Sequence, residues 1–205
     1  MIASSLLEVA YFALLAAGYR HGELSVVYPL ARGLAPVLVL LGTIGTATGQ
    51  QVAGVLLVGS GVLLVRGFHP GRGTGYGVLV ACCIASYTVV DKHGVAHASP
   101  LAYLELISVF MGLAYLAAFA GARGTAPVRA AFGWRPVVAG MATFAAYALV
   151  LKALTLAPAA PVAAVRETSV LFAAALGWLV LKERATVWRV AGVVLVTAGV
   201  ILVIT

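Results

Sequence analysis

The chain alternates between long apolar segments and short polar loops. Eight apolar segments lie at residues 2–18, 24–43, 51–66, 75–90, 99–120, 135–155, 159–181 and 186–204. A helix needs about 20 apolar residues to cross the hydrocarbon core of a membrane. Membrane strands would be shorter and would alternate apolar with polar residues, and these segments do not. The pattern predicts an all-α polytopic membrane protein with eight transmembrane helices.

The composition excludes a water-soluble protein. Hydrophobic residues make up 63% of the 205 residues and charged residues only 9%, whereas soluble domains have about 25% charged residues. The net charge of +7 is spread over short loops and forms no basic run. We therefore expect a lipid bilayer as partner and no nucleic acid. The expected location is a cell membrane, most simply a bacterial cytoplasmic membrane, crossed several times.

An internal repeat joins the two ends of the chain. The segment 52–65, VAGVLLVGSGVLLV, and the segment 190–203, VAGVVLVTAGVILV, are identical at ten of fourteen positions. Upstream, 30–42 matches 164–177 with small gaps, so that Arg32 falls on Arg166, and 10–15 matches 146–151. Spans 1–3 therefore resemble spans 6–8. The offset of five spans is odd, which predicts an inverted structural repeat of the kind found in secondary transporters.

This repeat also predicts the domain organisation. Residues 1–66 form a partial first repeat of three helices, and residues 75–205 form a second repeat of five. Together they make one membrane domain. In transporters with inverted repeats, the substrate site lies near the midplane, where the two repeats meet.

Two arginines occupy positions that should be apolar. Arg32 and Arg166 each lie roughly 10–12 Å into their spans at 1.5 Å per residue, where a charge costs about 2.5–3.5 kcal/mol. Two cations at matched depth in two repeats favour a substrate pathway. Snorkelling and a purely structural ion pair are the open alternatives. Tyr28, one turn before Arg32, lies on the same face.

Other residues beside the two arginines extend the predicted site. Pro29 and Pro36 each remove a backbone hydrogen bond, so we expect them to break the second helix where it faces an internal cavity. Ser169 shares a face with Arg166, whereas Glu167 could pair with Arg32 across the bundle. One cation would then stay unpaired, and an unpaired guanidinium suits a carboxylate or phosphate.

The remaining polar residues within the spans give weaker signals. Glu8 and Glu105 lie about one and a half turns inside their spans, which favours side chains that reach the membrane interface. No metalloprotease, nucleophile-elbow or phosphate-loop motif is present, so we expect neither catalytic residues, nor a metal, nor a cofactor.

Two strings carry a resemblance to a known family. They are SVVYPLARGLAPVLVLLG at 25–42 and APAAPVAAVRETSVLFAAALGWLVLKERATVWRVAGVVLVTAGVILV at 157–203. With AYFALLAAGYRHGEL before the first, they resemble the EamA-like family of the drug/metabolite transporter superfamily. The resemblance implies a ten-helix bundle of two inverted five-helix halves that moves small metabolites, often amino acids or drugs and frequently outward.

The resemblance also leaves functional alternatives. The eight spans look like the third to tenth helices of that fold, and the first copy has TIGTATGQQ where the second has LVLKERATVWR. We expect a secondary transporter or exporter of amino-acid-like or drug-like metabolites that works by alternating access. A homodimer or a partner could supply the missing helices. A truncated or accessory membrane subunit is the alternative, and a membrane enzyme acting on a lipid-linked substrate is a remote one.

Loop charges predict the orientation. Basic residues favour the cytoplasmic loops. The loops after spans 2, 4 and 6 hold only Lys92 and Lys152. The loops after spans 1, 3, 5 and 7 hold Arg20, Arg66, Arg72, Arg123, Arg129, Arg135, Lys182, Arg184 and Arg189. This asymmetry places both chain ends outside, whereas the family is usually drawn with cytoplasmic termini.

Overall fold

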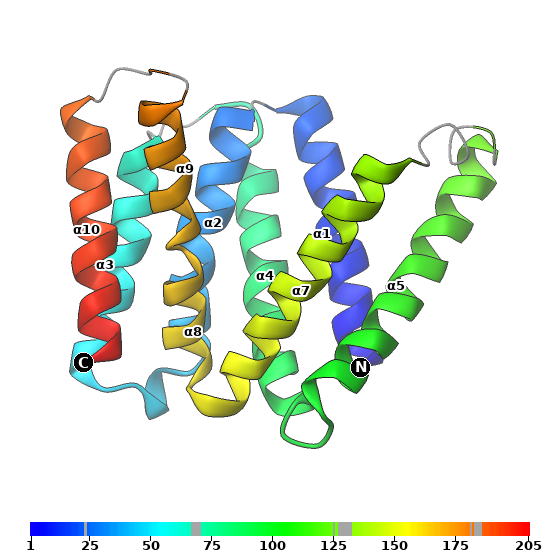
Figure 1. The fold of residues 1–205 in the computed structure, drawn as a ribbon, viewed down its shortest axis with the longest axis horizontal. Helices are drawn as coiled ribbons and strands as arrows, with labels where there is room; N and C mark the ends of the chain where they lie inside the picture. The colour runs from blue at the N-terminus through cyan, green and yellow to red at the C-terminus, as the bar shows by residue number, and fades with distance from the viewer. Residues whose placement is uncertain (23, 67–70, 125, 127–132, 181, 183–185) are drawn as a thin grey trace.

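The fold is a bundle of helices in a computed structural model that describes residues 1–22, 24–66, 71–124, 126, 133–180, 182 and 186–205 (Figure 1). These residues contain helices and no strands. The helices are α1 (Ile2–His21), α2 (Leu24–Gly42), α3 (Gly49–Arg66), α4 (Thr74–Gly94), α5 (Pro100–Arg123), α7 (Trp134–Leu156), α8 (Ala159–Arg166), α9 (Ser169–Leu179) and α10 (Val187–Ile204), with a 3-10 turn at Ile44–Thr46.

Helix length and hydropathy support a multi-pass membrane protein. Six segments of the described chain are long and apolar enough to cross a membrane, and one of them, Ala159–Leu176, joins α8 and α9. Two shorter apolar helices cover Val26–Gly42 and Gly49–Val65. Each of the eight apolar ranges seen in the sequence therefore contains helix, although one range is not a single helix.

The second helix differs from the prediction. Pro29 and Pro36 both lie inside α2, which continues across them. Proline at 36 cannot donate to the carbonyl of Arg32, and proline at 29 cannot donate to the carbonyl of Ser25. Neighbouring helices allow a membrane helix to continue past such prolines. The expectation that the two prolines break this helix is therefore wrong.

A tightened turn lies instead in the seventh predicted span, 159–181. There α8 ends at Arg166 and α9 begins at Ser169. Between them the amides of Glu167 and Thr168 bond to carbonyls three residues back rather than four. The Thr168 hydroxyl also donates to the Val165 carbonyl at 2.8 Å, and such back-bonding bends helices. Both residues keep a right-handed helical backbone, so α8 and α9 form one apolar span with a tightened turn at Glu167 and Thr168.

Helices α3 and α10 share the most extensive contact between helices in the described structure. Glycines allow this close approach. A Cβ added at Gly54 would lie 2.8 Å from the Gly199 carbonyl oxygen, and one at Gly192 would lie 2.6 Å from that of Gly61. At Gly61 and Gly199 the distances to the facing carbonyl oxygens are 2.7 and 2.6 Å.

These contacts are reciprocal with respect to the sequence repeat. Residues 52–65 align with 190–203, so Gly54 corresponds to Gly192 and Gly61 to Gly199. Gly54 faces Gly199, and its counterpart Gly192 faces Gly61. Likewise, the Cβ position of Gly54 meets Val203, and that of Gly192 meets Val65, the counterpart of Val203. The two repeated helices therefore pack about a local pseudo-two-fold axis.

Successive helices alternate in direction across the bundle (Figure 1). The order α1, α2, α3 runs up, down, up in that view, whereas α7, α8–α9, α10 runs down, up, down. Both chain ends lie on the lower side. Many large apolar side chains of α5 and α7 are exposed, including Leu113 and Met141, as expected for helices that face lipid.

The C-terminal ends of α1, α3, α5 and α9 lie on the side opposite the two termini (Figure 1), and basic residues follow each of these ends in the sequence, which allows the orientation to be tested. Arg129 and Arg184 lie outside the described residues. We expect a phosphatase fused after Thr205 to be active in the periplasm and a fluorescent protein fused there to stay dark. Cytoplasmic fluorescence would refute the orientation derived from loop charge.

Candidate functional site

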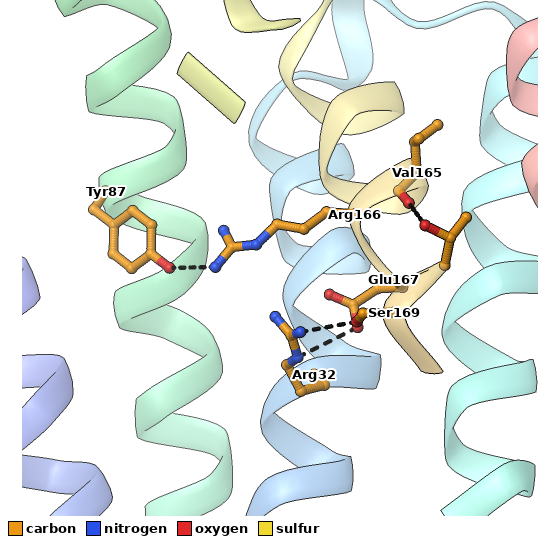
Figure 2. Close-up of polar contacts among 7 residues, drawn as sticks. Arg32, Tyr87, Val165, Arg166, Glu167 and Ser169 are labelled. Carbon is orange, nitrogen blue, oxygen red and sulfur yellow. Dashed lines mark hydrogen bonds and ion pairs between the residues drawn. The ribbon is translucent and has the colours of Figure 1, made fainter. Parts of the chain in front are cut away.

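The turn between α8 and α9 brings a carboxylate and a hydroxyl to Arg32 of α2. Glu167 Oε2 lies 3.5 Å from Arg32 Nε, and Arg32 Nη2 donates to Ser169 Oγ at 3.1 Å (Figure 2). The Arg32 side chain is 18% exposed and that of Glu167 only 4%. The sequence suggested that Glu167 could pair with Arg32, and that pair is present.

Arg166 extends from the same turn toward α4 rather than toward Arg32 (Figure 2). Its Nη2 donates to the Tyr87 hydroxyl at 3.4 Å. Its guanidinium carbon lies 5.8 Å from the ring centre of Tyr147, within the range of a cation–π contact. No carboxylate of the described residues lies within 4.0 Å of the Arg166 guanidinium nitrogens.

Tyrosines from three helices surround this second arginine. Tyr87 packs edge-on against Tyr11 and Tyr147, with 6.2 Å between ring centres in both pairs. Tyr11 and Tyr147 occupy matching positions in the repeated segments 10–15 and 146–151. Tyr28 lies on the Arg32 side, with its ring centre 5.8 Å from that guanidinium carbon. Each arginine therefore has an aromatic neighbour.

Only one ion pair forms at the two arginines in the described part of the chain. Arg32 and Arg166 are equivalent positions of the repeat, but Gly33 follows Arg32 where Glu167 follows Arg166, and only Arg32 has a carboxylate within 4.0 Å. In addition, Arg32 Nε and Glu167 Oε2 are buried and have no hydrogen-bond partner of good geometry. A buried donor without an acceptor costs free energy. The arrangement suits a small anion that accepts hydrogen bonds from guanidinium groups.

Sequence reasoning missed a buried acid, Asp91 of α4. Its side chain is fully buried and accepts hydrogen bonds from Ser4, Tyr103 and Tyr147, which belong to α1, α5 and α7. Asp91 lies one turn after Tyr87, and that spacing could have placed both residues on one inward face.

The reading of Glu8 as an interfacial residue is wrong. Glu8 is 9% exposed, and Ser4, one turn earlier, is completely buried. Ser4, Glu8 and Tyr11 form a polar stripe along one face of α1, and this stripe faces the bundle. Glu105 of α5, by contrast, is exposed.

Comparison with known families adds to this geometry. The EamA-like transporter family matches residues 71–205, about two thirds of the chain. These residues include Tyr87, Asp91 and the turn between α8 and α9, whereas Arg32 and Glu8 precede them. A comparison with curated proteins found no match. The chain belongs to the EamA-like transporter family.

Proposed function

We propose that this membrane protein is a secondary transporter of small anionic metabolites, with the substrate bound between Arg32 and Arg166. Its family and its membrane-spanning helices indicate transport of a small molecule. The proposal adds that the transported molecule is an anion. The observation that carries it is the presence of two inward guanidinium groups, of which only Arg32 has a carboxylate within 4.0 Å among the described residues.

The substrate would have a carboxylate or phosphate group and be of metabolite size. Guanidinium groups bind both groups with paired hydrogen bonds. Ser169 and the tyrosine hydroxyls add neutral partners, and the rings of Tyr28 and Tyr147 add flat apolar surface. Because Glu167 also lies in the site, a cationic group on the substrate, such as an amine, has a partner as well.

Three features of the fold support alternating access as the mechanism. Helix directions in α1–α3 oppose those in α7–α10 (Figure 1). The α3–α10 contacts are reciprocal between the repeats. The tightened turn between α8 and α9 lies at the proposed site, and the substrate site of inverted-repeat transporters lies where the repeats meet. We propose eight transmembrane spans in two inverted repeats, which rock against each other about the substrate.

Chemical modification at Ser169 tests whether the site is wet and attracts anions. We expect the Ser169→Cys variant, made in a background with Cys82→Ala and Cys83→Ala, to react with charged methanethiosulfonate reagents added in water. Each reagent's rate with the variant is divided by its rate with a free thiol. This ratio should be larger for the anionic sulfonate reagent than for the cationic ammonium reagent, because Arg32 lies beside Ser169. Lactate or phosphate should slow the reaction.

A lipid-facing position provides the matched control. Phe172 lies one turn along α9 and is 71% exposed, so Phe172→Cys should stay unmodified if this face meets lipid. A Ser169→Cys variant as unreactive as Phe172→Cys would contradict a water-filled site. Adding Arg32→Leu together with Glu167→Gln, so that no buried charge is left unpaired, should remove the preference for the anionic reagent.

A further inference from the structure

A second polar site lies beside the anion site, between α1, α4, α5 and α7. Asp91 is its centre: Oδ1 accepts from the hydroxyls of Ser4 and Tyr103, and Oδ2 accepts from the Tyr147 hydroxyl. All three donors are neutral, and no cation lies within 4.0 Å of Asp91 in the described part of the chain. The cluster is completed by Glu8, one turn after Ser4 on α1.

The hydrogen-bond donors around Asp91 and Glu8 indicate which of the two carboxyl groups is protonated. Glu8 lies between Ser4 and Tyr11 on the inward face of α1, and no side chain of the described residues donates a hydrogen bond to it. A tyrosine hydroxyl has one proton to donate, and the proton of Tyr147 goes to Asp91 Oδ2. The geometry therefore suits a protonated Glu8 beside an ionised Asp91.

The charges of the surrounding helices lead to the same state. Glu8 faces Asp91 of α4, Tyr147 of α7 and Arg166 of α8, and Tyr103 of α5 also lies near it. Arg32 of α2 faces Tyr11, further along α1. Apart from Lys92, which is directed to the end of α7, the buried or mostly buried charged groups are three acids, Glu8, Asp91 and Glu167, and two arginines. One proton on an acid balances them.

Two further cations near Asp91, Lys92 and the amino group of Met1, form no ion pair with it in the described structure. Lys92 directs its ammonium group to the end of α7, where it donates to the carbonyls of Leu154 and Ala157 at 2.6 and 2.9 Å. The amino group of Met1 faces Asp91, but Met1 is 44% exposed and forms no ion pair within 4.0 Å. Neither neutralises Glu8.

We propose that Glu8 is an exchangeable proton site, connected to the anion site through Tyr147. Tyr147 joins the two sites because its hydroxyl donates to Asp91, in the same cluster as Glu8, and its ring lies against the Arg166 guanidinium. Glu8 releases its proton to bulk water and becomes a carboxylate that faces Arg166. That negative charge weakens the attraction of Arg166 for an anion. Anion and proton therefore bind together, a consequence that rests on the proposed function.

Infrared difference spectroscopy tests the proton site without any transport. In lipid-reconstituted protein, raising the pH should remove the band of a protonated carboxyl group as Glu8 ionises. We expect Glu8→Gln to lack this band and Glu105→Gln, a matched change of an exposed acid on α5, to retain it. A band that survives in Glu8→Gln, or that is absent from the unmodified protein at every pH, would overturn the proposal.

The melting temperatures of two variants test independently whether Glu8 or Asp91 is protonated. Glutamine has the shape of protonated glutamate and is likewise uncharged, so Glu8→Gln should keep the melting temperature of the unmodified protein at neutral pH. Asp91→Asn loses the charge that three hydroxyls stabilise and should melt earlier. The reverse order would show that Glu8 is the ionised partner and would overturn the assignment.

The pH dependence of lactate binding tests the link to the anion site. Lactate stays a monoanion from about pH 5 to about pH 8. Its affinity should fall with rising pH, by at most about tenfold per pH unit for one linked proton. In Glu8→Gln the affinity should stay at its low-pH value. A flat profile in the unmodified protein would refute the linkage, whereas no lactate binding alongside a normal infrared band would refute the anion site alone.

Discussion

Replacing Arg166 with leucine is expected to weaken substrate binding and transport by roughly 10- to 100-fold while leaving a folded protein. The substitution removes the guanidinium that faces Tyr87 and Tyr147 but leaves no carboxylate unpaired within ion-pair distance. One charged hydrogen bond to the substrate contributes about 1.5–3 kcal/mol, so we expect an affinity loss of roughly 10- to 100-fold. Substrate counterflow in proteoliposomes measures this loss, and size-exclusion chromatography checks folding.

Arg32 requires a different design, because Arg32→Leu alone strands Glu167 in the membrane interior. Breaking a buried ion pair by removing one partner costs about 3–5 kcal/mol. The double variant Arg32→Leu/Glu167→Gln removes both charges and should fold, yet it should not transport. Arg32→Lys should already impair transport, since an ammonium group does not replace a two-pronged guanidinium.

The matched control for these changes is Arg20→Leu, which removes an exposed arginine at the end of α1. It should transport like the unmodified protein. Normal transport by both Arg166→Leu and the Arg32→Leu/Glu167→Gln double variant would show that the two arginines have a structural role only.

Alanine at any of the four α3–α10 glycines is expected to destabilise the bundle. The added Cβ would lie 2.6–2.8 Å from a carbonyl oxygen of the facing helix, so the helices must separate. Overpacking of this kind costs about 1–3 kcal/mol. We expect Gly54→Ala and Gly192→Ala to lower the melting temperature by similar amounts, because they are equivalent positions of the repeat. The same should hold for Gly61→Ala and Gly199→Ala.

Gly112→Ala is the control for the glycine series. Gly112 lies within α5, and a Cβ there would meet no atom within 4 Å. Alanine is the better helix former by about 1 kcal/mol, so this variant should be as stable as the unmodified protein or more so. Melting in detergent at one heating rate gives the comparison. Unequal losses within the equivalent pairs would contradict the pseudo-two-fold packing.

Much of the fold could be predicted from the sequence because the bilayer constrains it so strongly. In lipid, a single segment can satisfy its backbone hydrogen bonds only as a helix. The long apolar segments of the sequence therefore predicted where the helices lie. The internal repeat could be recognised in the sequence because both copies keep the glycines of the close helix contact. These are Gly54 and Gly61 in one copy and Gly192 and Gly199 in the other.

The errors came from interactions between segments that lie far apart in the sequence. Pro29 and Pro36 suggested a break in α2, but the surrounding helices allow α2 to continue. The tightened turn near Glu167 has no proline, and its sequence signal was the polar run from Arg166 to Ser169. Glu8 looked interfacial by its distance from the helix end. Its burial depends on Asp91 and Tyr147, which no local pattern connects to α1.

Substrate counterflow on the purified, reconstituted protein tests most directly whether a small anion passes between Arg32 and Arg166. Vesicles loaded with unlabelled lactate or phosphate are diluted into the labelled anion, with a labelled cationic amine as the comparison. We expect transient accumulation of a labelled anion, absent from empty vesicles and strongly reduced in the Arg166→Leu variant, and no accumulation of the amine. Accumulation of the amine alone, unchanged by Arg166→Leu, would contradict an anion site at these arginines.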